Sequence, residues 1–162
     1  MTKNQCSHWK FPTEFDVNDW YGFIYRIVNK TTRQEYIGKK QFFSVTRKKV
    51  VGRKNRKIVT KESNWKSYMS SSNYVKADIE EQGKDNFTFI IEALVKTKAA
   101  LNYKEIEMQV MEDVLRARFD NGEKRFYNNA IGTAVKFIPP DESPEESEMK
   151  LTEESRSEIL LG

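Results

Sequence analysis

Two parts of the chain are rich in β-branched and aromatic residues, and two others carry apolar residues at helical spacing. Residues 22–29 alternate around β-branched and aromatic side chains, which predicts a strand, and Tyr36 to Gly38 form its expected hairpin partner. Residues 86–95, with the sequence NFTFIIEALV, predict another strand. The basic stretch 44–62, which lies between these segments, is expected to form a loop or a long, frayed hairpin.

Two segments predict helices. The first follows three serines able to cap it, carries Val75 and Ile79 four residues apart, and ends at Gly83. The second covers residues 97–118 and begins at Thr97. Its expected apolar stripe comprises Tyr103, Ile106, Val110 and Val114. The later segment RFYNNAIGT is expected to close the fold as a strand or a turn.

These elements predict an α+β fold, with a short mixed or antiparallel sheet of about three strands flanked by helices. We divide the chain into an N-terminal arm (1–20), a domain (21–138) that contains the insertion 44–62, and a tail (139–162). The arm region carries four aromatic residues expected to pack on the domain, Trp9, Phe11, Phe15 and Trp20. The tail begins with two prolines and has the polar, acidic composition of a disordered segment.

Composition and charge narrow the choice of partner. At 162 residues, with 38% hydrophobic and 32% charged residues, the chain suits one soluble domain with tails. The net charge is +4, but the charges are unevenly distributed along the chain. Lys39 to Lys66 contains eleven lysines and arginines and one acid, and Asp141 to Gly162 contains eight acids and two basic residues. The stretch RKKVVGRKNRK has no interleaved acid, which favours nucleic-acid contact over a solvated loop, because neutralised phosphates release counterions. The candidate residues for contact with phosphates are Lys39, Lys40, Lys48, Lys49, Arg53, Lys54, Arg56, Lys57 and Lys66.

Several other classes of protein are disfavoured. No apolar run approaches the roughly 18 residues that cross a membrane, and the N-terminus lacks the apolar core of a signal peptide. Cys6 is the only cysteine, so the chain forms no internal disulfide and no cysteine zinc site, which fits a cytoplasmic protein. His8, the only histidine, lies in the arm, which disfavours a nuclease built on a histidine and a metal. No glycine-rich phosphate loop of the form GxxxxGK[ST] is present.

The first hairpin holds two triplets, Phe23-Ile24-Tyr25 and Tyr36-Ile37-Gly38, whose tyrosines are eleven residues apart. A tight turn at Lys30-Thr31 would place Tyr25 directly opposite Tyr36. A register slip of two residues would leave the phenols diagonal on one face, and a slip of one would separate them. On spacing alone the two rings form either an aromatic pair that stabilises the hairpin by about 0.2–1 kcal/mol, or a pair of phenols presented to a site.

The sequences FIYRIVN and EYIGKK resemble the two motifs of the GIY-YIG nuclease family, which lie on the first hairpin at this spacing. Phe23 replaces the leading glycine of the first motif, although Gly22 precedes it. Three later segments, SSSNYVKADIEEQGKDNF, EIEMQVMEDVL and YNNAIG, resemble further family elements in the same order. The resemblance covers residues 21–135 and implies a small GIY-YIG-like domain that acts as a DNA endonuclease.

The resemblance also implies a mechanism. Water would attack a phosphodiester in line, leaving 5′-phosphate and 3′-hydroxyl ends, with a tyrosine of the hairpin, Tyr25 or Tyr36, helping to deprotonate it. A free phenol has a pKa of about 10, so such a base needs nearby cations, which Lys39 and Lys40 could supply unless they only grip phosphate or face solvent. A single divalent ion, Mg²⁺ or Mn²⁺, would bind a glutamate of the second helix.

The second helix offers three candidates for that ligand, Glu105, Glu107 and Glu112. Glu107 is four residues from both Tyr103 and Met111, so it borders the expected apolar stripe, where a carboxylate can face the sheet. Glu105 lies further out on the helical wheel. Alignment with the family pattern also selects Glu107, which we therefore expect to bind the metal; otherwise it is a surface glutamate at the helix margin.

Other family residues match less directly. Asn128 matches the family asparagine that organises the phosphate site, although it could also be a turn residue. The family pairs an arginine with a histidine or tyrosine four residues later; Arg47 is near the expected place, but Val51 occupies the fourth position after it. Tyr68 could replace the histidine, with Arg47 folded back toward it, or Lys66 or Arg56 could supply the cation.

Within the family the chain looks most like compact phage homing or restriction-type members, which implies a bacteriophage origin and action on double-stranded DNA in the host cytoplasm, without membrane contact. Sequence specificity would come from the basic insertion or from a homodimer, or it is low. Two alternatives remain: a catalytically inactive nucleic-acid-binding module, and an interaction protein whose acidic tail, from Asp141 onward, docks on the basic insertion or on a partner.

Overall fold

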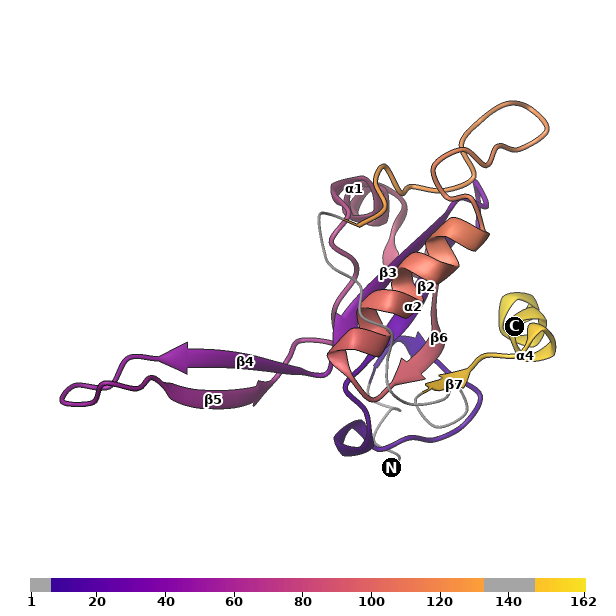
Figure 1. The fold of residues 1–162 in the computed structure, drawn as a ribbon. Helices are drawn as coiled ribbons and strands as arrows, with labels where there is room; N and C mark the ends of the chain where they lie inside the picture. The colour runs from indigo at the N-terminus through magenta and orange to yellow at the C-terminus, as the bar shows by residue number, and fades with distance from the viewer. Residues whose placement is uncertain (1–6, 133–147) are drawn as a thin grey trace.

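The structure, a computed structural model, describes residues 7–132 and 148–162 and contains an α+β domain built on a mixed sheet (Figure 1). The sheet has the order β1-β6-β2-β3, and β7 also pairs with β6. Its strands are β1 (Trp9–Lys10), β2 (Gly22–Asn29), β3 (Glu35–Gln41), β6 (Phe87–Val95) and β7 (Glu148–Lys150). β2 is antiparallel to both β3 and β6, and β1 is parallel to β6. The α+β class is confirmed, and β1 and β7 extend the sheet beyond the three strands expected.

The helices begin at capping residues that the sequence supplies. They are α1 (Asn73–Gln82), α2 (Lys98–Met111) and α4 (Glu153–Leu161), with the short 3₁₀ turns η1 (Val17–Asp19) and η2 (Lys84–Asn86). The side chains of Ser72, Thr97 and Thr152 each accept a hydrogen bond from a backbone N–H of the first turn. α2 is shorter than the expected helix over 97–118, because Asp113 adopts a left-handed φ of 51° just after the cap at Glu112.

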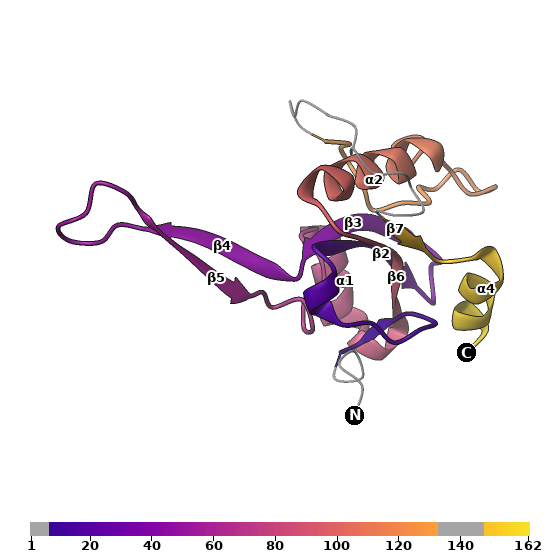
Figure 2. The ribbon, with the colours of Figure 1, turned by 60° about the horizontal axis from the view of Figure 1, so that its bottom comes forward.

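The two faces of the sheet support separate cores. Phe23, Tyr25 and Ile27 of β2 face α1 and the N-terminal arm, and Ile24 faces α2. Figure 2 shows α2 and α1 on opposite sides of the sheet. Every residue of β2 and of β6 is buried, as expected for central strands covered on both faces. The first strand of the hairpin, which carries Tyr25, therefore lies inside the sheet, and its second strand, β3, which carries Tyr36, forms an edge of the sheet.

The N-terminal arm packs on the body, as its aromatic residues predicted. Trp9 and Phe15 are buried, and Phe11 and Trp20 pack against the same core cluster. The indole N–H of Trp9 donates a 2.7 Å hydrogen bond to the carbonyl of Trp65, which lies beyond the basic insertion in the sequence.

The basic insertion forms a two-stranded antiparallel ribbon, β4 (Phe43–Lys48) and β5 (Lys57–Glu62). Of the two forms expected for this stretch, the structure has the long hairpin. Among the described strands, β4 and β5 pair only with each other, and Figures 1 and 2 both show the ribbon projecting away from the domain. We refer to residues 43–62 below as the ribbon.

The prediction of a disordered tail is wrong for residues 148–162. β7 pairs with β6, Leu151 is buried against Val28 and Ile90, and Arg156 of α4 bonds the buried Glu92. The prediction failed because it rested on the acidic composition of the segment, whereas a few residues, such as Leu151 and Arg156, bind the segment to the sheet. The expected docking of the tail on the basic insertion is not seen here, since 148–162 docks on β6; the preceding residues 139–147 lie outside the described part.

In the described part of the chain, no helix is both long enough and apolar enough to cross a membrane.

Candidate active site

The register of the first hairpin brings the two tyrosines together on one face. Tyr25 pairs with Gly38, so Tyr25 and Tyr36 are diagonal, as expected for a slip of two residues from the tight-turn register. Their ring centroids lie 6.0 Å apart. The slip arises because the turn is longer than two residues: the side-chain oxygen of Asn29 accepts hydrogen bonds from the N–H groups of Thr31 and Thr32.

Gly38 permits this packing. A Cβ atom at position 38 would lie 2.5 Å from Oη and 2.6 Å from Cζ of Tyr25, and 2.9 Å from Cε1 of Tyr36. The fully buried Tyr25 ring therefore passes directly over the glycine of the second triplet. This contact explains in steric terms why the triplet ends in a residue without a side chain.

Tyr25 has a hydroxyl group in an unusual position. The residue is fully buried, and its Oη has no hydrogen-bond partner of normal geometry, although the Tyr68 phenol and Ser70 hydroxyl lie near it. Burial raises the pKa of Tyr25 well above its usual value. Tyr68 packs edge-on against Tyr25, with ring centroids 5.9 Å apart, so the structure brings Tyr68 into the same cluster as both hairpin tyrosines.

A pocket of about 440 Å³ opens beside Tyr36. It is lined by β3, residues 102–109 of α2, the N-terminal end of α1 and residues from the segment 127–132, including Tyr36, Lys39, Ser72, Glu105, Gln109 and Asn128. The Tyr36 hydroxyl lies 3.1 Å from Oγ of Ser71, and burial raises the pKa of Tyr36 above its ordinary value. Because the first N–H groups of a helix lack intrahelical partners, the start of α1 favours an anion in this pocket.

Glu105, rather than Glu107, is the carboxylate of this pocket. The Glu105 side chain is 15% exposed and lies 3.3 Å from Nζ of Lys39. Burial raises the pKa of Glu105, and the Lys39 ammonium offsets this in part. Glu107 does not line the pocket; it is 35% exposed and pairs at 3.4 Å with Lys104. The structure therefore does not bring Glu107 together with the tyrosines.

The apolar stripe that we expected on α2 is not its buried face, which explains why we expected Glu107 and the structure places Glu105 in the pocket. Tyr103 and Val110, which we placed on the buried face, are 44% and 59% exposed. The buried face of α2 instead contains Ala100, Leu101, Lys104, Met108 and Gln109. Glu105 lies four residues after Leu101 and three before Met108, so it borders the true apolar stripe. This spacing from two apolar residues was the feature of the sequence that could have identified Glu105 as the carboxylate of the pocket.

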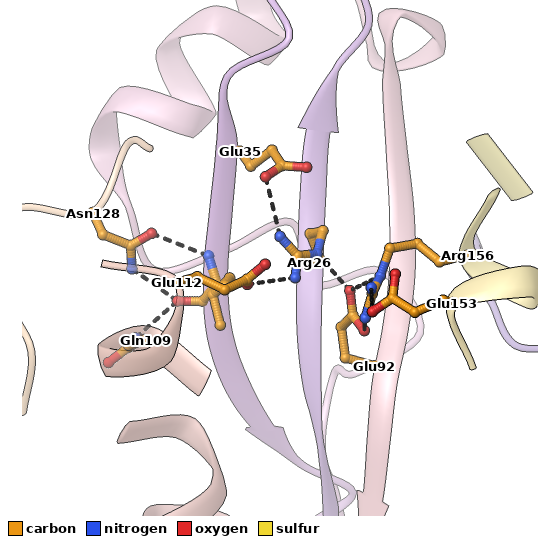
Figure 3. Close-up of polar contacts among 9 residues, drawn as sticks. Arg26, Glu35, Glu92, Gln109, Glu112, Asn128, Glu153 and Arg156 are labelled. Carbon is orange, nitrogen blue, oxygen red and sulfur yellow. Dashed lines mark hydrogen bonds and ion pairs between the residues drawn. The ribbon is translucent and has the colours of Figure 1, made fainter. Parts of the chain in front are cut away.

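Asn128 and Gln109 hold the backbone of Ile37, the middle residue of the second triplet (Figure 3). Asn128 accepts a 3.1 Å hydrogen bond from the Ile37 N–H and donates a 2.8 Å bond to its carbonyl, which also accepts from Gln109 at 2.9 Å. Asn128 thus positions β3 beside the pocket with both the oxygen and the nitrogen of its side-chain amide. Oε1 of Gln109 is buried and has no hydrogen-bond partner among the residues that the structure describes. The sequence did not indicate a role for Gln109.

Lys40 and Lys39 follow the second triplet but differ in their contacts. Nζ of Lys40 lies 4.1 Å from the centre of the Tyr68 ring, and burial lowers the pKa of Lys40. Nζ of Lys39 instead faces the pocket and donates to Oδ1 of Asn102 at 2.7 Å.

The structure does not bring Arg47 into the pocket. Arg47 lies on β4, exposed and paired across the ribbon with Ile58. Five other candidates are likewise exposed on the ribbon, namely Lys48, Arg53, Lys54, Arg56 and Lys57, and Lys49 is exposed where the ribbon turns. Lys66 is exposed after the ribbon and lies 3.8 Å from Glu62.

An ionic cluster lies beside the pocket on the α2 face of the sheet (Figure 3). The buried Arg26 contacts Glu92, Glu35 and Glu112 with its three guanidinium nitrogens. Burial opposes the charged form, but these carboxylates outweigh it and raise the pKa of Arg26. Glu92 also accepts two hydrogen bonds from Arg156. The cluster thus joins β2, β3, β6, the end of α2 and α4.

A sequence model of a domain family, described as "Putative endonuclease segE, GIY-YIG domain", matches residues 6–131. Comparison with curated proteins and with solved structures gave no match. The matched segment includes every candidate residue described above and the whole ribbon, and it ends before β7 and α4.

Proposed function

The chain belongs to the GIY-YIG nuclease family, and from this premise we propose that it is a metal-dependent DNA endonuclease that leaves 5′-phosphate and 3′-hydroxyl ends. One observation carries the proposal: the pocket gathers a phenol, a carboxylate and an ammonium group, from Tyr36, Glu105 and Lys39, beside the N-terminal end of a helix. Hydrolysis of a phosphodiester needs a group that accepts a proton, a cation that absorbs charge, and donors that hold the phosphate.

We assign the divalent ion, Mg²⁺ or Mn²⁺, to Glu105 in place of Glu107. The donors fit such an ion: Glu105 supplies a carboxylate, and the buried Oε1 of Gln109 lacks a partner. Mg²⁺ commonly binds through one or two carboxylates together with waters and substrate phosphates, so the single carboxylate of Glu105 is compatible with it. When bound, the ion would neutralise negative charge that develops on the phosphate.

The phosphate would be held by Lys39 and by the N-terminal end of α1. Lys39 lies between Asn102 and Glu105, so its ammonium is fixed at the side of the pocket. A phosphate bound there would gain a charge-assisted hydrogen bond from Lys39 and the favourable end of the helix dipole. Asn128 would act indirectly, by holding the strand that carries Tyr36 and Lys39.

Tyr36 is the phenol placed to receive the proton of the attacking water. Because burial keeps Tyr36 neutral at neutral pH, its own proton would leave through Oγ of Ser71, 3.1 Å away, and the Ser71 hydroxyl would release its proton to solvent as the water proton arrives. The water oxygen would form the new bond to phosphorus, the bond to the 3′ oxygen would break, and the departing 3′ oxygen would take a proton from solvent to become the 3′-hydroxyl. Tyr25 packs against Tyr36, with ring centroids 6.0 Å apart, and its buried hydroxyl would support the Tyr36 phenol during the transfer. One pocket cuts one strand at a time, so a double-strand break would need a second cleavage, either by the other chain of a homodimer or by the same chain acting again.

The test is cleavage of supercoiled plasmid in Mg²⁺, Mn²⁺ or EDTA, with Glu105→Gln and Glu107→Gln as matched variants of one helix. We expect metal-dependent cleavage that falls roughly 100-fold or more in Glu105→Gln and stays near the wild-type rate in Glu107→Gln. The reverse order of the two variants would return the metal to Glu107. Plasmid and varied phage and host DNA that stay intact in every metal but are retarded in a gel would instead identify a catalytically inactive binding module.

A further inference from the structure

Within residues 7–132 and 148–162, the core clusters do not include the ribbon beyond Phe43 at its root. None of residues 44–61 belongs to a core cluster, and Val45 and Ile58 are 59% and 62% exposed. A two-stranded ribbon held only by its own ladder is marginally stable. The ribbon is thus marginally stable by itself, and its residues 44–61 add nothing to the core clusters of the described residues. This arrangement indicates a partner outside the domain.

The two faces of the ribbon differ in chemistry. The register pairs Ser44 with Lys61, Thr46 with Val59 and Lys48 with Lys57, and side chains of alternate pairs share a face. One face, which we call the lysine face, therefore carries Ser44, Thr46, Lys48, Lys57, Val59 and Lys61. The opposite face carries Phe43, Val45, Arg47, Ile58, Thr60 and Glu62. Five of the six side chains on the lysine face can form hydrogen bonds, against three of six on the opposite face, so hydrogen-bonding groups are more numerous on the lysine face.

The positive charge of the ribbon is not neutralised by the domain. It contains eight lysines and arginines and one acid, Glu62. Glu62 lies at the root, where it accepts a 3.0 Å hydrogen bond from the Trp65 indole. Among the described residues, none of the eight forms an ion pair. A polyanion is the complementary partner.

We propose that the ribbon lies in the major groove of duplex DNA, with the lysine face toward the base edges and the basic turn between β4 and β5 against phosphates. This inference rests on the proposed function, because it takes DNA as the partner. The major groove is about 12 Å wide and admits a two-stranded ribbon. Lysine, serine and threonine side chains hydrogen-bond to base edges there, so the lysine face would supply the sequence preference of the enzyme.

The ribbon is attached to the pocket at both ends. β4 follows β3, which carries Tyr36 and Lys39, and β5 leads through residues 63–72 to the start of α1. Lys39 and Lys48 are nine residues apart, which at about 3.3 Å per residue limits their separation to about 30 Å. One turn of B-DNA is about 34 Å, so the bases contacted by the ribbon should lie within about ten base pairs of the cut, on one side.

The experiment measures binding of the full chain to a DNA duplex of about 40 base pairs in EDTA, by fluorescence anisotropy at about 0.15 M salt. The test variant is Lys48→Gln/Lys57→Gln/Lys61→Gln. The control, Lys84→Gln/Lys98→Gln/Lys150→Gln, changes the net charge equally at exposed positions away from the ribbon. We expect the test variant to bind about tenfold more weakly or worse, and the control to stay within about twofold of wild type.

A groove-specific measurement accompanies the affinities. Methylation of guanine N7, which lies in the major groove, should weaken wild-type binding but not the residual binding of the test variant. Equal affinities of the two triple variants, or insensitivity of the wild type to N7 methylation, would overturn the proposal. So would equal affinity for an RNA duplex of the same sequence, whose major groove is too narrow for the ribbon. Since EDTA prevents metal-dependent cleavage, failure of the nuclease proposal leaves these results unaffected, and the two failures are distinguishable.

Discussion

The ionic cluster beside the pocket predicts that α4, at the C-terminal end of the chain, stabilises the whole domain. Arg156 of α4 donates to both carboxylate oxygens of Glu92, at 3.0 and 2.5 Å. The Glu92 side chain is 0% exposed, so water cannot replace a lost donor. The decisive perturbation is Arg156→Ala, which leaves Glu92 with one remaining ionic partner, Arg26.

The expected loss of stability in Arg156→Ala depends on Arg26, which still contacts Glu92. Removing one member of a buried ion pair costs about 3–5 kcal/mol, and we expect about 3 kcal/mol here because Arg26 stays in contact with Glu92. For a chain of 162 residues this corresponds to a fall in Tm of about 6–12 °C. Burial favours a neutral Glu92, but Arg156 and Arg26 outweigh it and lower the pKa of Glu92.

The pH dependence has a definite sign. Because the folded pKa of Glu92 lies below the unfolded value of about 4.3, the stabilisation is complete at neutral pH and is lost as the pH falls through the folded pKa. The difference in Tm between wild type and Arg156→Ala should therefore shrink in acid.

Thermal unfolding followed by circular dichroism, at pH 7 and at about pH 3, measures both effects. The matched control is Arg116→Ala, which breaks an ion pair whose side chains are 84% and 45% exposed and should leave Tm unchanged. If Arg156→Ala melts within 2 °C of wild type at pH 7, or if its deficit is the same at both pH values, the reasoning fails.

Three further predictions concern the hairpin and its supports. Gly38→Ala should destabilise the fold by about 1–3 kcal/mol in urea titrations, because the added methyl group meets the buried Tyr25 ring; wild-type stability would contradict this packing. Asn128→Ala should cost about 2–3 kcal/mol, since it orphans the Ile37 N–H while Gln109 still bonds the carbonyl; a smaller loss would mean that water reaches this site. Tyr25→Phe should raise stability by about 1 kcal/mol, because it removes a buried hydroxyl without a partner, and should also slow plasmid cleavage; unchanged cleavage would remove Tyr25 from the mechanism.

The parts of the fold that depend on local pattern were predictable. Residues 22–29 form the expected strand, since alternating aromatic and β-branched side chains fill the two cores on either side of it. The serines before α1 and Thr97 before α2 cap their helices as predicted, because a cap depends only on neighbouring backbone groups.

Features that depend on distant contacts were not predictable from local pattern. The docking of residues 148–162 depends on Glu92, a buried carboxylate inside the otherwise apolar strand β6, which needs a cation from elsewhere in the chain. Arg156 supplies it, but in sequence it stands among acids and resembles part of a disordered segment. The register of the first hairpin likewise depended on how the side chain of Asn29 closes the turn.

The choice of glutamate shows how buried polar residues mislead a helical wheel. The inner face of α2 contains Lys104 and Gln109, both about 5% exposed or less, because each bonds a partner outside the helix. A stripe drawn through apolar residues avoids these positions and rotates toward Tyr103, whose ring is exposed. That rotation brings Glu107 to the apparent edge of the core and takes Glu105 away from it. The partner of Gln109 is the backbone of Ile37, so the residue that hid the true face of α2 also holds the second tyrosine triplet beside the pocket. Where a helix supports a polar site, its phase is therefore better read from the partners its polar residues require than from hydrophobicity alone.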